Sequence, residues 1–145
     1  MKKTLFRTAV LALAVTSITA CSKNSDKKSN TEMLTSASWK ISSAGFDMDK
    51  NGTVDQPEDI EDCNLDDVAI FTTGGTGTFN VGAVKCDPAE PQTDDFTWSF
   101  KNNESELEYD GETMKILSLD DKNIKLYEDI IINNTSFRYL VIFSH

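Results

Sequence analysis

The strongest constraint on the fold is a series of short segments that alternate like β-strands, separated by turn sequences. Aromatic and hydroxyl side chains alternate over residues 96–100, which places the aromatic rings on one face of an extended strand. The pairs at 102–103, 110–111 and 133–134 consist of Asn, Asp and Gly, which favour tight hairpin turns. The predicted strands cover residues 38–46, 67–73, 76–82, 94–101, 104–110, 112–119, 122–131 and 135–143.

Short connections between these strands predict an antiparallel, all-β domain. No segment after the N-terminal region shows a long helical period. Eight strands joined in sequence favour a small up-and-down barrel, which leaves no unpaired sheet edge. A β-sandwich is the alternative, because the number of strands does not distinguish the two.

A secretory signal is predicted at the N-terminus. Three basic residues within the first seven positions precede a short apolar stretch at 9–15. The stretch is shorter than the roughly 20 residues of a spanning helix. Residues 18–21, Ile-Thr-Ala-Cys, resemble the lipobox of bacterial lipoproteins, in which the peptide is cut before an acylated cysteine. We expect residues 1–20 to be a signal peptide and Cys21 to carry fatty acids such as palmitate; an ordinary signal with a chance cysteine is the alternative.

The segment after the signal predicts a tether and a location. Residues 21–33 are mostly polar and cannot bury enough apolar surface to order themselves, so we expect a flexible tether there. The folded domain is then residues 34–145. Ser22, rather than Asp, follows Cys21, which resembles lipoproteins sent to the outer membrane. The predicted location is the bacterial cell envelope, on the outer membrane, with the membrane as a partner through the lipid anchor.

Acidic composition excludes one class of partner. The net charge is −10, and loss of the three basic residues of the signal would leave 11 basic against 24 acidic residues, or −13. Such a surface repels nucleic acid and anionic lipid, so no nucleic-acid partner is expected.

Cysteine usage predicts a disulfide. If Cys21 is acylated, Cys63 and Cys86 remain in an oxidising compartment, where disulfides persist. Two free buried thiols and two soft metal ligands are the alternatives. A metal site of this kind is less favoured, because the chain offers only one histidine, His145, as a further ligand.

Residues 47–58 have the spacing of a calcium-binding loop. Oxygen ligands fall at alternate positions, and Gly52 lies where such a loop turns sharply. Calcium takes 6–8 oxygen ligands, so one short loop has to surround it. The predicted calcium ligands are Asp47, Asp49, Asn51, Thr53 through its carbonyl, Asp55 and Glu58.

The surroundings of this loop differ from an EF-hand. The preceding residues resemble a strand and not a helix, and we expect a short helical turn after the loop, capped by Asp55 with Pro57 in its first positions. A single loop favours a structural role for calcium over a sensing role. A solvated acidic turn is the alternative, because Asp, Asn and Gly are common turn residues.

Four segments of the folded region share a family pattern. They are residues 34–41 with Trp39, residues 62–71 with Cys63, residues 74–79, and residues 85–100 with Cys86 and Trp98. Together they resemble the small lipocalin-like domains of bacterial envelope lipoproteins. The resemblance implies a compact barrel and no single activity.

The interior of such a barrel is narrow, so aromatic side chains can fill it. The expected interior residues are Phe79, Phe96, Trp98, Phe100, Tyr109, Phe137, Tyr139 and Phe143. A filled interior predicts a structural or protein-binding lipoprotein, whereas an open one predicts a pocket for a small apolar ligand.

An enzyme is not expected. The chain offers no combination of nucleophile and base and no phosphate-binding glycine loop before a helix. Asp94 and Asp95 point to opposite faces of a strand, and Glu106 and Glu108 fit a solvated outer face. The sequence therefore predicts a non-enzymatic binding module whose partner is a small apolar ligand or an envelope protein.

Overall fold

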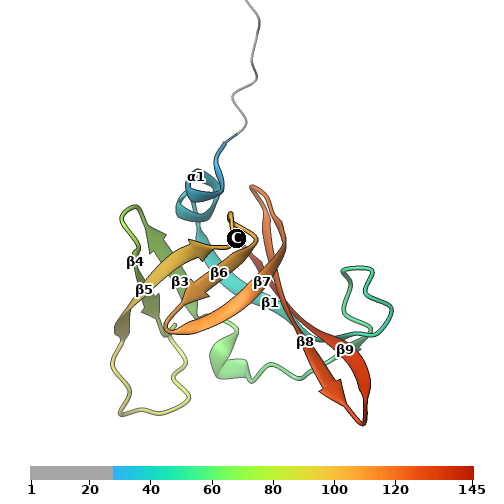
Figure 1. Cartoon of the computed structure of the whole chain (residues 1–145). Coiled ribbons are helices and arrows are strands. Elements are labelled where there is room, and N and C mark those ends of the chain that lie inside the picture. The colour runs from blue at the N-terminus through green and yellow to red at the C-terminus, as the bar shows by residue number, and fades with distance from the viewer. Residues whose placement is uncertain (1–27) are drawn as a thin grey trace, which may run out of the picture.

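The computed structural model describes residues 28–145, which form a barrel of antiparallel strands with one short helix (Figure 1). The elements are α1 (Asn30–Thr35), β1 (Ser38–Asp47), β2 (Gln56–Pro57), a 3-10 turn (Asp62–Asn64), β3 (Val68–Thr72), β4 (Thr76–Asn80), β5 (Thr93–Lys101), β6 (Glu106–Tyr109), β7 (Glu112–Leu119), β8 (Asn123–Ile132) and β9 (Thr135–Ser144). All eight predicted strands are present, and their ends differ from the prediction by at most two residues.

Closure of the sheet makes the fold a barrel. Strands β3 to β9 pair with their neighbours in sequence, and β1 pairs with both β3 and β9. The start of β1 pairs with β3, since Trp39 lies opposite Ala69, and the rest runs along β9 as far as Asp47 opposite Arg138. The prediction of a barrel is confirmed, and the β-sandwich alternative is excluded.

A ninth strand was not predicted. Residues 56–57 form β2, which pairs with Gly45 and Phe46 of β1. The expected helical turn at Pro57 is therefore wrong. Strand β9 occupies one edge of β1. The opposite edge pairs with β3 at the start of β1 and with β2 near its end. Proline is accepted at such a sheet margin, where its missing N–H interrupts no ladder.

The first helix begins within the segment 21–33, for which a flexible tether was expected. Ser29 caps α1 in a capping box with Glu32, whose side chain accepts from the Ser29 backbone. Six residues are too few to produce a helical period in the sequence, which is why the helix was missed. Leu34 is fully buried, so α1 covers one end of the barrel (Figure 1).

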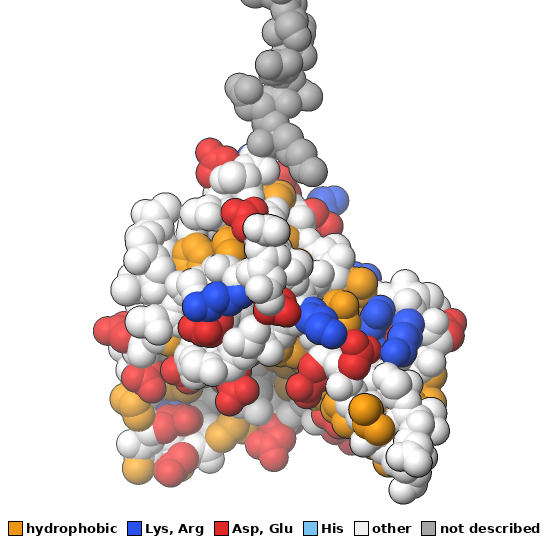
Figure 2. Space-filling model, in the orientation of Figure 1, with side chains coloured by type: hydrophobic (Ala, Val, Ile, Leu, Met, Phe, Trp, Pro, Cys, Tyr) orange, Lys and Arg blue, Asp and Glu red, His pale blue; other side chains and the backbone are white. Residues whose placement is uncertain are grey.

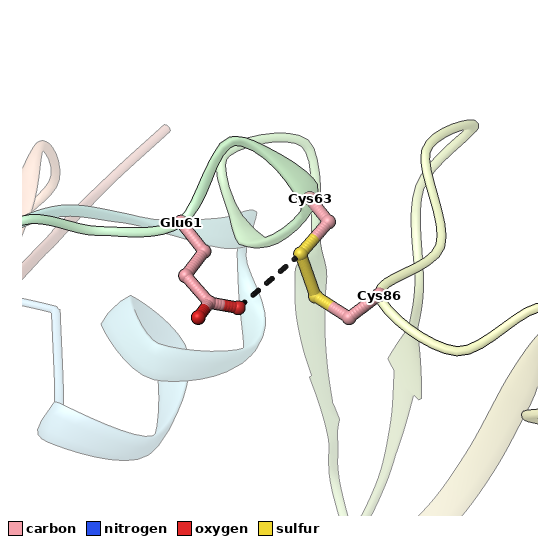
Figure 3. A group of neighbouring side chains, drawn as sticks. All are labelled: Glu61, Cys63 and Cys86. Carbon is pink, nitrogen blue, oxygen red and sulfur yellow. Dashed lines mark hydrogen bonds between the residues drawn. A yellow bond between two sulfur atoms is a disulfide. The ribbon is translucent and has the colours of Figure 1, made fainter.

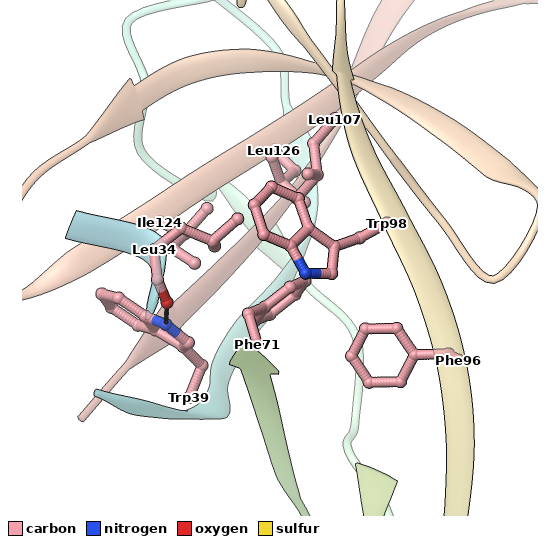
Figure 4. Close-up of a cluster of buried hydrophobic side chains, with 8 residues drawn as sticks. All are labelled: Leu34, Trp39, Phe71, Phe96, Trp98, Leu107, Ile124 and Leu126. Carbon is pink, nitrogen blue, oxygen red and sulfur yellow. Dashed lines mark hydrogen bonds between the residues drawn. The ribbon is translucent and has the colours of Figure 1, made fainter. Parts of the chain in front are cut away.

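The main core lies next to this helix. Figure 4 shows Phe71 between Phe96 and Trp98, with edge-to-face rings. Gly77 of β4 has the ring of Phe96 over it, so a Cβ there would collide with that ring. The buried cluster consists of Leu34, Trp39, Phe71, Phe96, Trp98, Leu107, Ile124 and Leu126.

The predicted aromatic interior is only partly correct. Phe96 and Trp98 are buried, and Phe100, Tyr109 and Phe143 pack against the cluster. Phe79, however, is 39% exposed. Aliphatic residues take much of the core instead, because alternation identifies a face of a strand without saying how far along the barrel that face is covered.

The rings of Phe137 and Tyr139 pack on Phe46 and do not belong to the buried cluster. These two residues lie in the first half of β9, near the β8–β9 hairpin. Of the predicted aromatic residues of β9, only Phe143 packs against the main core.

The predicted signal peptide and Cys21 lie outside the described residues. Within residues 28–145, no helix is long and apolar enough to cross a membrane.

Candidate functional site

The loop after β1 folds around the carboxylate of Asp47. This side chain is fully buried, and its two oxygens accept hydrogen bonds of 2.9 Å from the N–H groups of Asn51 and Gly52. Gly52 has φ 87°, a conformation that favours glycine. The loop thus wraps its backbone around the first predicted calcium ligand.

Other predicted ligands cluster beside Asp47. Carboxylate oxygens of Asp47, Asp49 and Asp55 all lie within 4.8 Å of one another. Asp49 accepts from the backbone and side chain of Asn51 at 3.1 and 2.9 Å, and Asp55 accepts from the Met48 N–H at 2.7 Å. The side-chain oxygen of Asn51 accepts from Thr53. Oxygen atoms in this arrangement are the type of ligand that calcium prefers.

The last predicted ligand lies apart from this group. Glu58 accepts a 2.7 Å hydrogen bond from the hydroxyl of Tyr139 on β9. Burial and this hydrogen bond, followed by the nearby carboxylate charges, raise the pKa of Tyr139 to about 12. The structure brings three of the predicted carboxylates together, whereas the fourth, Glu58, follows β2 and is hydrogen-bonded to Tyr139 of β9.

Basic residues from β8 and β9 hold the loop to the barrel. Arg138 Nη1 lies 3.5 Å from Asp47 Oδ2 and partly compensates the buried charge, and its guanidinium lies 4.2 Å from the ring centre of Tyr127. Lys125 donates a 2.7 Å hydrogen bond to the carbonyl of Gly52. These partners were not predicted, because no local pattern relates residue 138 to residue 47.

The predicted disulfide is present. Cys63 and Cys86 are bonded, with their Cα atoms 5.2 Å apart, and they join the 3-10 turn to the β4–β5 loop (Figure 3). Glu61 Oε2 lies 3.6 Å from the Cys63 sulfur. The bond removes both thiols from metal chemistry, which excludes the alternatives of free thiols and of soft metal ligands.

A cavity of about 300 Å³ lies inside the barrel, and no residue of α1 lines it. Its walls are mainly aromatic and aliphatic, with three carboxylates among them. Burial raises the pKa of Tyr109 in this wall, and the charges of Glu112 and Asp110 raise it further. The lining consists of Ala69, Phe71, Phe79, Asp94, Asp95, Phe96, Leu107, Tyr109, Asp110, Ile124, Leu126 and Phe143.

A second cavity of about 340 Å³ adjoins the first, and the two share Ala69, Phe79 and Phe143. It extends between β1 and the loop of residues 58–67. A space of this size and apolar character, in a barrel with one covered end, is typical of a small-molecule site.

Comparison with protein families agrees with the architecture. A model of the lipocalin-like domain matches residues 35–126, from the end of α1 to the first part of β8. The chain belongs to the lipocalin-like domain family. A search among curated proteins found no match.

Lipocalin-like domains are typically binding modules and not enzymes. The carboxylate pairs considered in the sequence do not form acid–base pairs in this lipocalin-like domain, because each carboxylate has different surroundings. Asp95 accepts from the Thr78 hydroxyl at 3.0 Å, while Asp94 follows the inward phase of Phe96. Glu108 lies 3.4 Å from Lys101 on the exposed surface.

Several residues of the lipocalin-like cavity were not singled out by the sequence analysis, among them Ala69, Ile124 and Leu126. Asp94 was considered only as half of an acidic pair. The only sequence signal that Asp94 lies on the inner face was its spacing of two and four residues from Phe96 and Trp98. How open the barrel is at Asp94 depends on its neighbours in space.

Proposed function

We propose that this protein is a lipid-anchored envelope lipoprotein whose barrel binds a small apolar ligand and whose loop at residues 47–58 binds a structural calcium ion. The observation that carries the proposal is the cavity of about 300 Å³, lined by Phe71, Phe96, Leu107 and Leu126 among others. Burial of an apolar molecule there would be favoured by roughly 25 cal/mol for each Å² removed from water.

Ligand binding is tested by titrating the purified chain with N-phenyl-1-naphthylamine, a neutral apolar dye. We expect a saturable rise in fluorescence with one site per chain. Ala69→Phe should abolish it, because Ala69 lies in the wall of both cavities. Ile70→Phe is the matched control, since the neighbouring residue faces the outside of β3. Equal dye binding by the two variants would refute a site inside the barrel.

Calcium binding is supported by the group of Asp47, Asp49 and Asp55. The expected affinity is that of an extracellular module, with Kd about 10⁻⁴–10⁻³ M. Calorimetric titration in chelator-washed buffer should show one site and a raised melting temperature. Asp49→Asn should weaken binding, whereas Asp59→Asn, outside the group, should not.

Glu58→Gln separates two arrangements of the site. If Glu58 completes the calcium shell, the variant should bind calcium more weakly. If Glu58 instead stays outside the shell, bonded to Tyr139, the calcium affinity should be unchanged. Absence of any binding heat up to about 10 mM calcium would reduce the loop to an acidic turn.

Membrane anchoring is tested with Cys21→Ser. The wild-type chain should incorporate a labelled fatty acid and sediment with the membrane, whereas the variant should do neither. A single acyl chain gives only marginal binding, so stable anchoring requires two or more. Retention of the variant on the membrane would show that another part of the chain anchors it.

A protein partner is the second candidate function. Ile131 is 74% exposed at the end of β8, and Ile132 beside it is also exposed. Two apolar side chains at a hairpin tip favour contact with another envelope protein. Cross-linking of the chain in intact cells, compared with an Ile131→Asp variant, tests this role.

A further inference from the structure

The cavity opens where the wall of the barrel is incomplete. Strand β6 ends at Tyr109, and the N–H of Asp110 donates to the carbonyl of Thr97 at 3.0 Å. Strand β5 continues beyond this point to Thr93, with β4 as its only partner there. The inner face of residues 93–96 therefore borders an opening on the β6 side.

An aromatic ring and a carboxylate stand side by side at this opening. Phe79 of β4 and Asp94 of β5 are direct cross-strand partners. Phe96 and Trp98, two and four residues after Asp94, are buried, so the strand period places Asp94 on the same inner face. Direct partners on one face have Cβ atoms about 4.5–5.5 Å apart, so one ligand group can touch both.

The carboxylate of Asp94 has no partner within the described part of the chain. None of the side-chain hydrogen bonds or ion pairs between residues 28–145 involves it. This differs from Asp95, whose carboxylate accepts a hydrogen bond from the Thr78 hydroxyl. Asp94 is thus available to a ligand that enters the cavity.

The charge of the whole opening has one sign. Asp94, Asp95 and Asp110 line the first cavity, and the second adds Glu58, Asp59, Glu61 and Asp67. None of the residues that line either cavity is Lys, Arg or His. Figure 2 shows acidic side chains over the lower part of the molecule, between the loop of residues 81–92 and the β8–β9 hairpin.

We propose that the cavity selects small organic cations: molecules with an apolar or aromatic body and one ammonium group. The body lies against the cavity wall formed by Phe71, Phe96 and Leu126, and the ammonium group stays at the mouth, over the ring of Phe79 and beside Asp94. Cation–π attraction and a carboxylate partner both favour a positive charge there. A low-dielectric wall strengthens the field of the acidic opening, which disfavours anions. This inference rests on the proposed ligand-binding function and specifies its ligand class.

The test compares three probes that share a naphthyl body and differ in charge: 1-naphthylmethylammonium, 1-naphthylmethanol and 1-naphthoate. Each is titrated into the purified full chain at pH 7 by calorimetry, at low and at high salt. We expect the ammonium to bind most tightly, the alcohol more weakly and the carboxylate most weakly. The advantage of the ammonium should shrink at high salt, because Asp94, Asp95 and Asp110 are exposed to solvent.

Asp94→Asn is the decisive variant, since it keeps the shape and removes the charge. We expect the ammonium to lose up to about fivefold in affinity, the upper end for an exposed charge pair, and the alcohol to be unchanged. Glu128→Gln is the matched control, because Glu128 is an exposed carboxylate of β8 that lines neither cavity. It should leave all three affinities as they are.

The outcomes separate this inference from the function on which it rests. Equal affinity for the three probes would overturn the selection of cations and leave apolar ligand binding intact. Tighter binding of the carboxylate would overturn it as well. Absence of binding by all three probes and by N-phenyl-1-naphthylamine would overturn both. Equal losses in Asp94→Asn and Glu128→Gln would show a general charge effect and refute the assigned role of Asp94.

Discussion

The indole Nε1 of Trp39 donates a 2.8 Å hydrogen bond to the carbonyl oxygen of Leu34, and both residues are almost completely buried. The bond joins α1 to the start of β1 and satisfies a carbonyl near the C-terminal end of the helix (Figure 4). It gives a six-residue helix, too short to be stable alone, a defined position over the end of the barrel. One end of the barrel is thereby covered, and no residue of α1 lines the cavity.

Truncation of Leu34 should destabilise the domain strongly. Leu34→Ala removes a fully buried side chain from the cluster, and comparable substitutions cost about 2–5 kcal/mol. Leu65→Ala is the control, because Leu65 is exposed and its loss should change stability by about 0.5 kcal/mol or less. Urea denaturation followed by circular dichroism gives both free energies of unfolding. Equal losses in the two variants would contradict the role of α1 as a cover.

The disulfide should contribute to stability through the unfolded state. Cys63 and Cys86 are 23 residues apart in sequence, and closing a loop of this size is worth roughly 3 kcal/mol. The double variant Cys63→Ser/Cys86→Ser should therefore unfold at lower urea concentration. Reduced and oxidised forms of the unmodified protein provide the second comparison. If reduction left the unfolding midpoint unchanged, the bond would not constrain the domain.

Removal of Arg138 should have opposite effects on the calcium-free fold and on calcium affinity. Its side chain is only 13% exposed and compensates the buried Asp47. Arg138→Met should cost about 1–3 kcal/mol without calcium, since a buried charge loses a partner. The proposed calcium ion should then bind more tightly, because a competing cation is gone. Calorimetric titration measures the affinity, and melting with and without calcium measures the stability.

Lys50→Met is the control for this prediction. Lys50 lies in the same loop and pairs with Asp129 at the surface, so its removal changes the net charge equally without uncovering Asp47. An equal gain in calcium affinity for both variants would indicate long-range attraction alone. A loss of affinity in Arg138→Met would show that Arg138 shapes the loop and does not compete with the ion.

Stability should fall at high pH because of Tyr139. Its folded-state pKa, about 12, lies above the ordinary value of 10.0, so the fold favours the protonated phenol. This contribution is fully present below about pH 10 and is lost as the pH rises toward 12. Melting temperatures should decline over this window, and Tyr139→Phe should reduce the decline. Absorbance titration at 295 nm reports the ionisation itself. A parallel decline in the variant would assign the effect to other groups.

Local physical chemistry explains why the strands could be predicted. Alternation over residues 94–101 and the Asn and Gly turns act within a few residues, so they are visible without knowledge of the partners. The same holds for the spacing of Asp47, Asp49 and Asp55, which a loop brings together over nine positions. The pairing of Cys63 with Cys86 could be inferred because few cysteines are available.

Tertiary structure decided what depends on contacts between distant parts of the chain. The sequence by itself determined the eight strands, their turns and the acidic loop. Ring closure between β1 and β9, the addition of β2 to β1, and the approach of Arg138 to Asp47 depend on which edges and faces remain free once the other strands have paired. Phe79 shows the same limit. Its phase in β4 follows from alternation, but its exposure beside Asp94 follows from the early end of β6, which leaves the barrel open at that point.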